Sequence, residues 1–189
     1  MVPLTALAIP IVLAAVLVFL ASSVLHMVIS FWHRDDLDPL PDEDGVMNAL
    51  RPFNLPPGNY AMPLVRSAGA MRDPAFIEKM KRGPVAFLTV RHTGAPSMGK
   101  PLMLWFIYSI VVGIFAAYIA GRALPPGAEY LDVFRFAGTT AFAGYGLALM
   151  HESIWWGGKW GATIRAMIDG LIYAALTAGA FGWLWPPAM

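Results

Sequence analysis

Cysteine is absent from this chain of 189 residues, and charged residues make up only 13% of it. The first absence excludes disulfides, thiolate metal sites and thiol catalysis. The second, together with an apolar content of 58%, excludes an ordinary soluble domain, in which about a quarter of the residues are charged. The formal net charge of +1 is too small to indicate a nucleic-acid-binding protein. The composition is that of an integral membrane protein.

Four apolar stretches are long enough to cross a bilayer, since a spanning helix needs about 20 mostly apolar residues. We predict transmembrane helices over residues 1–32, 101–121, 132–156 and 162–185. The first stretch is longer than the roughly 7–15 apolar residues of a signal peptide and has no basic start, so we interpret it as a permanent helix. The predicted fold class is therefore an all-α integral membrane protein built as a four-helix bundle.

Lysine and arginine orient the predicted bundle. Residues 34–100 hold nine basic residues, and the connection between the third and fourth helices adds Lys159 and Arg165. Only Arg122 and Arg135 lie near the connection between the second and third helices. Because cytoplasmic loops carry the excess of basic residues, both termini are predicted on the outer, periplasmic side, with a long cytoplasmic segment over residues 33–100. Composition and topology together favour a multi-pass protein of the bacterial inner membrane.

The cytoplasmic segment begins with an acidic run. The carboxylates fit the first turn of a short helix ending near Leu50, where the helix dipole favours negative charge. A divalent-cation site is the alternative, but the calcium-loop pattern fails because Arg51 stands at the twelfth position, where a glutamate is needed. The proline-rich stretch 52–63 and residues 85–91 are predicted to be extended. The acidic residues are Asp35, Asp36, Asp38, Asp42, Glu43 and Asp44.

A short amphipathic helix is predicted over residues 73–82. Asp73 is a good N-cap, Pro74 suits the first helical position, and Gly83 begins the Gly-Pro pair that ends the element. Such a helix lies on a membrane surface or against a partner. Its candidate contact residues are the apolar Phe76, Ile77 and Met80 and the basic Lys79, Lys81 and Arg82.

Two other features of the cytoplasmic segment carry little weight. Residues 94–100 fit the glycine-rich pattern of a phosphate-binding loop, but Pro101 stands where a serine or threonine must hold magnesium. We interpret Lys100 as an anchor that reaches toward lipid headgroups. His33 and His92 are interpreted as solvated or hydrogen-bonded residues.

Ionisable residues inside the predicted spans are more informative, because such groups are costly in lipid and face a bundle interior. At 1.5 Å per residue, His26, His151 and Asp169 lie about 6–10 Å inside the inner boundary. A structural network is one interpretation: Arg165 would pair with Asp169, and His151 or Glu152 would join them. The alternatives are a b-type haem ligated by His26 and His151, a metal site built from the histidines and carboxylates, and a proton relay through Asp169.

Small residues recur every four positions along the fourth predicted helix and part of the third. This spacing lets helix backbones approach closely in a membrane. Packing between the two helices within one chain explains the pattern, and a dimer or a foreign helix in the same groove is the alternative. The residues are Ala162, Ala166, Gly170, Ala174, Ala178 and Gly182 on the fourth helix, and Thr140, Gly144 and Ala148 on the third.

The sequence contains no recognisable catalytic constellation, neither a nucleophile–base pair nor a metalloprotease pattern, and no inverted repeat typical of transporters. We therefore expect a non-catalytic accessory, scaffolding or assembly subunit. Its expected partners are the lipid bilayer and either another membrane protein or a second copy of itself. The alternative function is the handling of haem, metal or protons by His26, His151 and Asp169.

Overall fold

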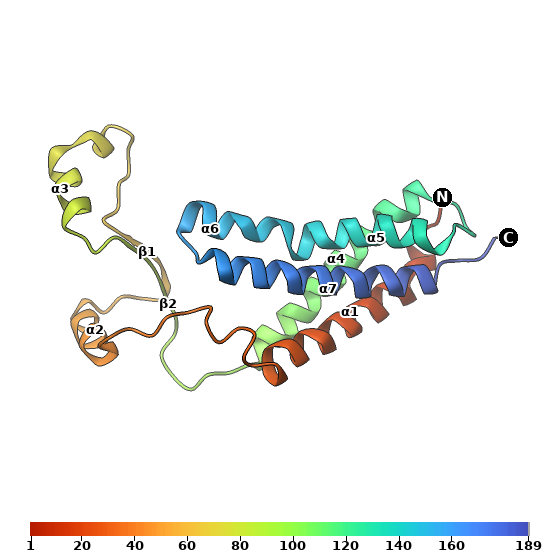
Figure 1. Cartoon of the computed structure of the whole chain (residues 1–189), viewed down its shortest axis with the longest axis horizontal. Coiled ribbons are helices and arrows are strands. Elements are labelled where there is room, and N and C mark those ends of the chain that lie inside the picture. Colours follow the sequence, from red (N-terminus) through yellow and green to blue (C-terminus); the bar gives the residue numbers. More distant parts are fainter. Residues whose placement is uncertain (189) are drawn as a thin grey trace. The chain divides into compact units, whose positions relative to one another are not determined.

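The computed structural model describes residues 1–188, which form two compact units (Figure 1). The first unit joins residues 1–38 to the chain from Ser97 onward and contains the long helices. The second unit is formed by residues 39–96, the greater part of the predicted cytoplasmic segment.

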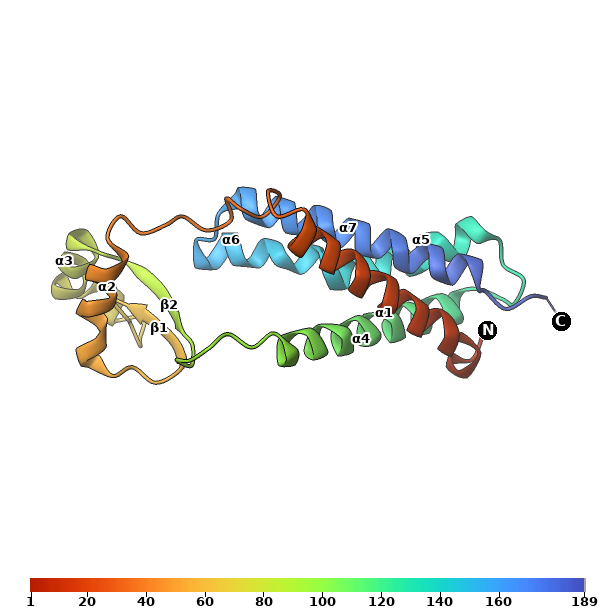
Figure 2. The ribbon, with the colours of Figure 1, turned by 90° about the horizontal axis from the view of Figure 1, so that it is seen from below.

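The described part of the first unit contains four long helices that pack as a bundle (Figures 1 and 2). Helix α1 packs against α4 and α7, and α5 packs against the same two helices. Both chain ends lie at the same end of this bundle (Figures 1 and 2). The long helices are α1 (Ala8–Ser23), α4 (Gly99–Ala123), α5 (Tyr130–Tyr145) and α7 (Trp160–Trp183), and the shorter elements are η1 (Leu4–Leu7), η2 (Val24–Val28), η5 (Leu147–Leu149) and α6 (Met150–Trp156).

Within residues 1–188, three helices are long and apolar enough to cross a membrane. They are Leu4–Val28, in which η1, α1 and η2 run on from one another, Gly99–Ala123 and Trp160–Trp183. They correspond to the predicted spans 1–32, 101–121 and 162–185, so the structure is mostly helical and three of the four predicted spans have the length and apolar character that a membrane crossing needs.

The predicted span 132–156 is not one continuous helix. Helix α5 ends at Tyr145, and Gly146 leaves the helical region at φ −124° and ψ −47° before η5 and α6 resume. A Cβ atom on Gly170 of α7 would come within 2.8 Å of the Gly146 Cα atom. The interruption therefore lies where α7 approaches the backbone so closely that a side chain on Gly170 would collide with it.

Small residues on α7 form its contact with α5. Ala174 and Ala178 are buried, and a Cβ atom on Gly138 of α5 would lie 3.0 Å from that of Ala178. A Cβ atom on Gly182 would lie 2.6 Å from the ring of Tyr130. The periodic small residues of α7 are thus used for packing within the chain.

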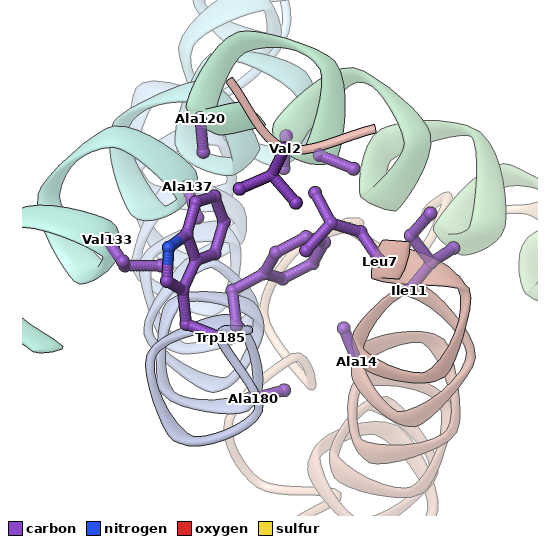
Figure 3. Packing of buried hydrophobic residues seen from close by; sticks show 12 residues of the cluster. Val2, Leu7, Ile11, Ala14, Ala120, Val133, Ala137, Ala180 and Trp185 are labelled. Carbon is purple, nitrogen blue, oxygen red and sulfur yellow. The ribbon is translucent and has the colours of Figure 1, made fainter. Parts of the chain in front are cut away.

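Buried apolar side chains form two clusters in the bundle. The first lies at the end of the bundle that holds the chain termini and includes Trp185. The Trp185 indole N–H donates to the Pro125 carbonyl at 2.9 Å. The second surrounds Tyr145 and Tyr173; next to it, Gly144 lies against Val112 of α4 rather than against α7. Figure 3 labels nine members of the first cluster: Val2, Leu7, Ile11, Ala14, Ala120, Val133, Ala137, Ala180 and Trp185.

The second unit has short elements, and none of its residues is buried. The Asp73 carboxylate caps the predicted helix by accepting from the Ala75 N–H at 2.9 Å, and Pro74 occupies its first turn. The predicted extended stretches contain two antiparallel strands that pair Tyr60 with Leu88. The elements are α2 (Glu43–Leu50), η3 (Arg51–Phe53), β1 (Gly58–Met62), η4 (Ala70–Arg72), α3 (Pro74–Arg82) and β2 (Ala86–Val90).

Candidate functional site

His26 lies at the end of the first apolar helix, where the α-helix changes to a π-helical turn. Residues 24–28 form the π-helical turn η2, in which the Ile29 N–H donates to the Val24 carbonyl at 3.0 Å. Such turns insert one extra residue into a helix and are frequent at functional sites. His26 lies within this turn, and its side chain is exposed.

The chain after η2 is tied to the first half of α7 (Figure 2). Lys159, which precedes α7, forms an ion pair with Asp38 at 2.6 Å and donates to the Asp35 carbonyl at 3.2 Å. Arg165, one and a half turns into α7, donates through Nε to Asp36 Oδ1 at 2.8 Å and through Nη2 to the same oxygen. Residues 29–38, which we call the strap, are therefore fixed to α7 by polar contacts.

Asp169 is the buried centre of this arrangement, with 2% of its surface exposed. Its Oδ1 atom accepts from the Trp32 indole N–H at 2.9 Å, and its Oδ2 atom lies 2.8 Å from His33 Nε2. A buried carboxylate is tolerated only when it is hydrogen-bonded and paired. Both oxygens of Asp169 meet this requirement through the strap.

His33 lies between two carboxylates. Its Nδ1 atom is 2.6 Å from Asp36 Oδ2, while its Nε2 atom faces Asp169. Desolvation raises the pKa of Asp36, but hydrogen bonds from Arg165 and His33 outweigh it, so the pKa lies below its ordinary value. Asp36 is thus an ionised acceptor, and it fixes a proton on Nδ1 of His33. Both ring nitrogens of His33 thus face carboxylate oxygens, Nδ1 that of Asp36 and Nε2 that of Asp169.

His26 completes the cluster. Its ring stacks on that of His33, with centroids 4.3 Å apart and planes 16° apart. One potential ligand atom from each of His26, His33 and Asp169 lies within 4.8 Å of the others. The carbonyl of Ser22 is 3.0 Å from His26 Nδ1, and because a carbonyl only accepts, Nδ1 carries the proton. The Nε2 atom of His26 keeps a free electron pair.

The predicted polar residues divide into two groups. His26, Arg165 and Asp169 belong to the cluster, but Arg165 pairs with Asp36 and not with Asp169 as the sequence suggested. His151 and Glu152 lie exposed on α6, and neither is a member of the histidine–aspartate group.

The sequence reasoning did not place His33, Asp36 and Trp32 in this site. The available signal was the dense run Trp-His-Arg-Asp-Asp directly after the first apolar stretch. A long apolar run followed at once by aromatic, histidine and acidic residues sets these groups at the membrane boundary, level with polar residues on neighbouring helices.

A second polar and aromatic cluster lies deeper in the bundle. The Trp105 indole N–H donates to Ser22 Oγ at 2.8 Å, and the Tyr108 hydroxyl donates to the Gly144 carbonyl at 2.5 Å. The rings of Trp105, Tyr145 and Tyr173 pack together, with centroids 5.7–6.0 Å apart. Among the described residues, the Tyr173 hydroxyl is the one buried side-chain polar atom without a hydrogen-bond partner.

Comparison with known proteins adds no family to this geometry: no protein-family model, no curated protein and no solved structure matches the chain.

Proposed function

We propose that the chain is a multi-pass protein of the bacterial inner membrane that acts as a non-catalytic accessory, scaffolding or assembly subunit. The observation that carries this proposal is the state of residues 39–96, in which no side chain is buried. A unit without buried side chains gains little stability from its own core. Its apolar side chains therefore need a covering surface.

The proposed topology has four crossings, with α5 and α6 together forming the third. Helix α5 packs between α4 and α7 as a full member of the bundle. The common position of the two chain ends supports an even number of crossings. The excess of basic residues in 34–100 supports a cytoplasmic location for that segment and periplasmic termini.

The proposed contact surface lies on α3 and the other exposed apolar residues of the second unit. Phe53 is 70% exposed, and Ile77 and Met80 on α3 are about two-fifths exposed. Contiguous exposed apolar groups mark interaction sites in proteins. The exposed apolar residues of the unit include Leu40, Met47, Phe53, Leu64, Met71, Ile77 and Met80.

The charge of the second unit favours a protein partner over a bare lipid surface. Helix α3 ends in Lys79, Lys81 and Arg82, whereas α2 begins with Glu43 and Asp44. Anionic headgroups attract the basic end but repel the acidic one. Another membrane protein can present complementary charge to both, and such complementarity sets the orientation and specificity of an interface.

The test is to extract the protein from native membranes in a mild detergent and measure the mass of the particle that contains it. We expect an assembly larger than the 20.5 kDa chain. The double change Phe76→Ser and Met80→Ser should release the chain, while Glu78→Ser, on the same exposed helix, should leave the assembly intact. Thermal unfolding of the released variant would verify that the bundle is still folded. A wild-type protein that elutes as a single chain would refute the proposal.

A second candidate function is the handling of a metal ion, a haem or protons, and the cluster of His26, His33 and Asp169 favours it over a purely structural role. A visible absorption spectrum of the purified protein separates these possibilities. A Soret band that disappears in His26→Ala and in His151→Ala would indicate the bis-histidine haem. A spectrum without this band leaves a metal ion or protons.

A further inference from the structure

We propose that His26, His33 and Asp169 form a binding site for a divalent transition-metal cation, with Zn²⁺ as the representative ion. Two imidazoles and one carboxylate are a standard ligand set for Zn²⁺ and for Fe²⁺. Mg²⁺ and Ca²⁺ prefer sites made of oxygen atoms. This site rests on the second candidate function above, and it fails or succeeds independently of the proposed subunit function.

The two histidines are prepared for metal binding by the hydrogen bonds of their other ring nitrogens. The Ser22 carbonyl accepts a hydrogen bond from His26 Nδ1, and the Asp36 carboxylate accepts one from His33 Nδ1. Each imidazole thus offers Nε2. Metal-ligating histidines almost always donate their second N–H to a carbonyl or carboxylate in this way, which fixes the ring and increases its basicity.

The carboxylate is prepared in the same manner. The Trp32 indole N–H donates to Asp169 Oδ1 and holds the group in place, so that Oδ2 faces His33 Nε2. A metal ion would bind Oδ2 and Nε2 together, which lie 2.8 Å apart. Arg165 supports the arrangement from outside, because it neutralises Asp36 and leaves Asp169 as the negative ligand.

The spacing of the ligand atoms is close to that of a metal site. Bonds of about 2.0–2.1 Å in tetrahedral geometry place ligand atoms roughly 3.3 Å apart. One potential ligand atom from each of the three residues lies within 4.8 Å of the other two. Binding therefore requires His33 Nε2 and Asp169 Oδ2, now 2.8 Å apart, to separate slightly, and the exposed His26 to approach them. Because the protein supplies three ligands, a fourth position stays open for water or another small ligand.

The other acidic candidate of the sequence does not compete with this site. Asp38 pairs with Lys159 and Asp35 with Arg34, while Asp42 caps α2 by accepting from the Gly45 N–H. The acidic run is thus divided among separate partners. Of these residues, Asp36 takes part in the cluster, because its carboxylate accepts a hydrogen bond from His33 Nδ1.

The test uses the full-length chain in detergent, stripped with a chelator and then titrated with Zn²⁺ in a calorimeter. We expect one ion to bind per chain, because one ligand atom from each of the three residues lies close to the other two. His33→Ala and Asp169→Asn should each weaken the affinity at least tenfold. His26→Gln changes an exposed position whose hydrogen bond is to the Ser22 carbonyl of the same helix. It should weaken the affinity to the same extent while leaving thermal unfolding of the stripped protein unchanged.

The matched controls are His92→Ala, in the second unit, and His151→Ala, on α6. Both are exposed histidines outside the cluster, so both variants should bind as the wild type does. Stoichiometric binding that survives the change of all three ligands would overturn the proposal. So would the absence of binding by the wild type with both Zn²⁺ and Fe²⁺. Loss of binding in His151→Ala would overturn the assigned ligand set.

Discussion

The Asp169→Ala substitution tests the energetic role of the cluster directly. It removes the acceptor of the Trp32 indole N–H and the partner of His33 Nε2, at a position with 2% of its surface exposed. No solvent can replace the lost oxygens at such a site without a rearrangement of the strap. The two donors are therefore left without their partner.

The expected size of the effect depends on the charge of the carboxylate. Hydrogen bonds to a charged group contribute about 1.5–3 kcal/mol each, and removing one partner of a buried ion pair costs about 3–5 kcal/mol. Neutral hydrogen bonds between membrane helices average only about 0.6 kcal/mol. Two bonds to an ionised Asp169 thus predict a loss of about 3–5 kcal/mol, whereas two neutral bonds predict about 1 kcal/mol.

The loss is measured by unfolding the detergent-solubilised protein in a titration with a denaturing surfactant. Glu129→Ala is the control, since Glu129 is exposed and its side chain does not cap α5; it should change the free energy of unfolding by less than about 0.5 kcal/mol. Asp169→Asn keeps an acceptor for Trp32 and should fall between the two variants. Equal stabilities of Asp169→Ala and Glu129→Ala would refute the argument that a buried ionised carboxylate holds the strap.

Three further predictions concern other parts of the chain. Because the chain has no native cysteine, single cysteines at Thr5 and Ala188 should react with an impermeant reagent in intact cells, whereas one at Ser67 should not; labelling at 67 would reverse the orientation. Tyr173→Phe removes a buried hydroxyl that has no partner among the described residues, and it should keep or raise the free energy of unfolding by about 1 kcal/mol; a loss of that size would indicate a hidden partner. Asp36 has a lowered pKa, so its contribution is present at neutral pH and disappears as the pH falls through the folded-state pKa; a stability difference between wild type and Asp36→Asn that persists unchanged in acid would contradict this.

The predictable parts of the fold depend on local patterns. Apolar runs locate the three continuous membrane-length helices to within a few residues at most ends. The Asp73-Pro74 start and the Gly83 stop of α3 are equally local, because capping and φ restrictions act within a few residues. Each of these features is determined by residues adjacent in the sequence.

The break at Gly146 could not be predicted in the same way. A glycine in an apolar run predicts close helix packing as readily as an interruption. The difference is determined by Gly170, which lies 24 positions further along the chain and meets Gly146 backbone to backbone. The pairing of β1 with β2 is likewise a contact between distant segments.

For the candidate site, the sequence predicts the level of His26 and Asp169 along the bundle but not which residues they bind. Residue spacing places His26 and Asp169 at one level of the bundle, and the structure brings them together. Local reasoning pairs Arg165 with Asp169 because they lie one helical turn apart. In the structure, Asp36 from the strap binds Arg165 instead, and Trp32 and His33 take both oxygens of Asp169. The sequence shows which residues could pair with Arg165 and Asp169. Which of them do so depends on the path of the strap over α7.

Substitution of His26 distinguishes a purely structural network, which holds the strap against α7, from a metal-binding site. A structural network needs Trp32, His33 and Asp36 from the strap with Arg165 and Asp169 from α7, and their hydrogen bonds form a complete set without His26. Within residues 1–188, the only polar contact given for His26 is to a carbonyl of its own helix. A structural role therefore predicts that His26→Gln changes nothing beyond a stacking contact with His33. A metal site predicts the loss of cation binding with the stability of the stripped protein unchanged, and this pattern cannot arise from the network alone.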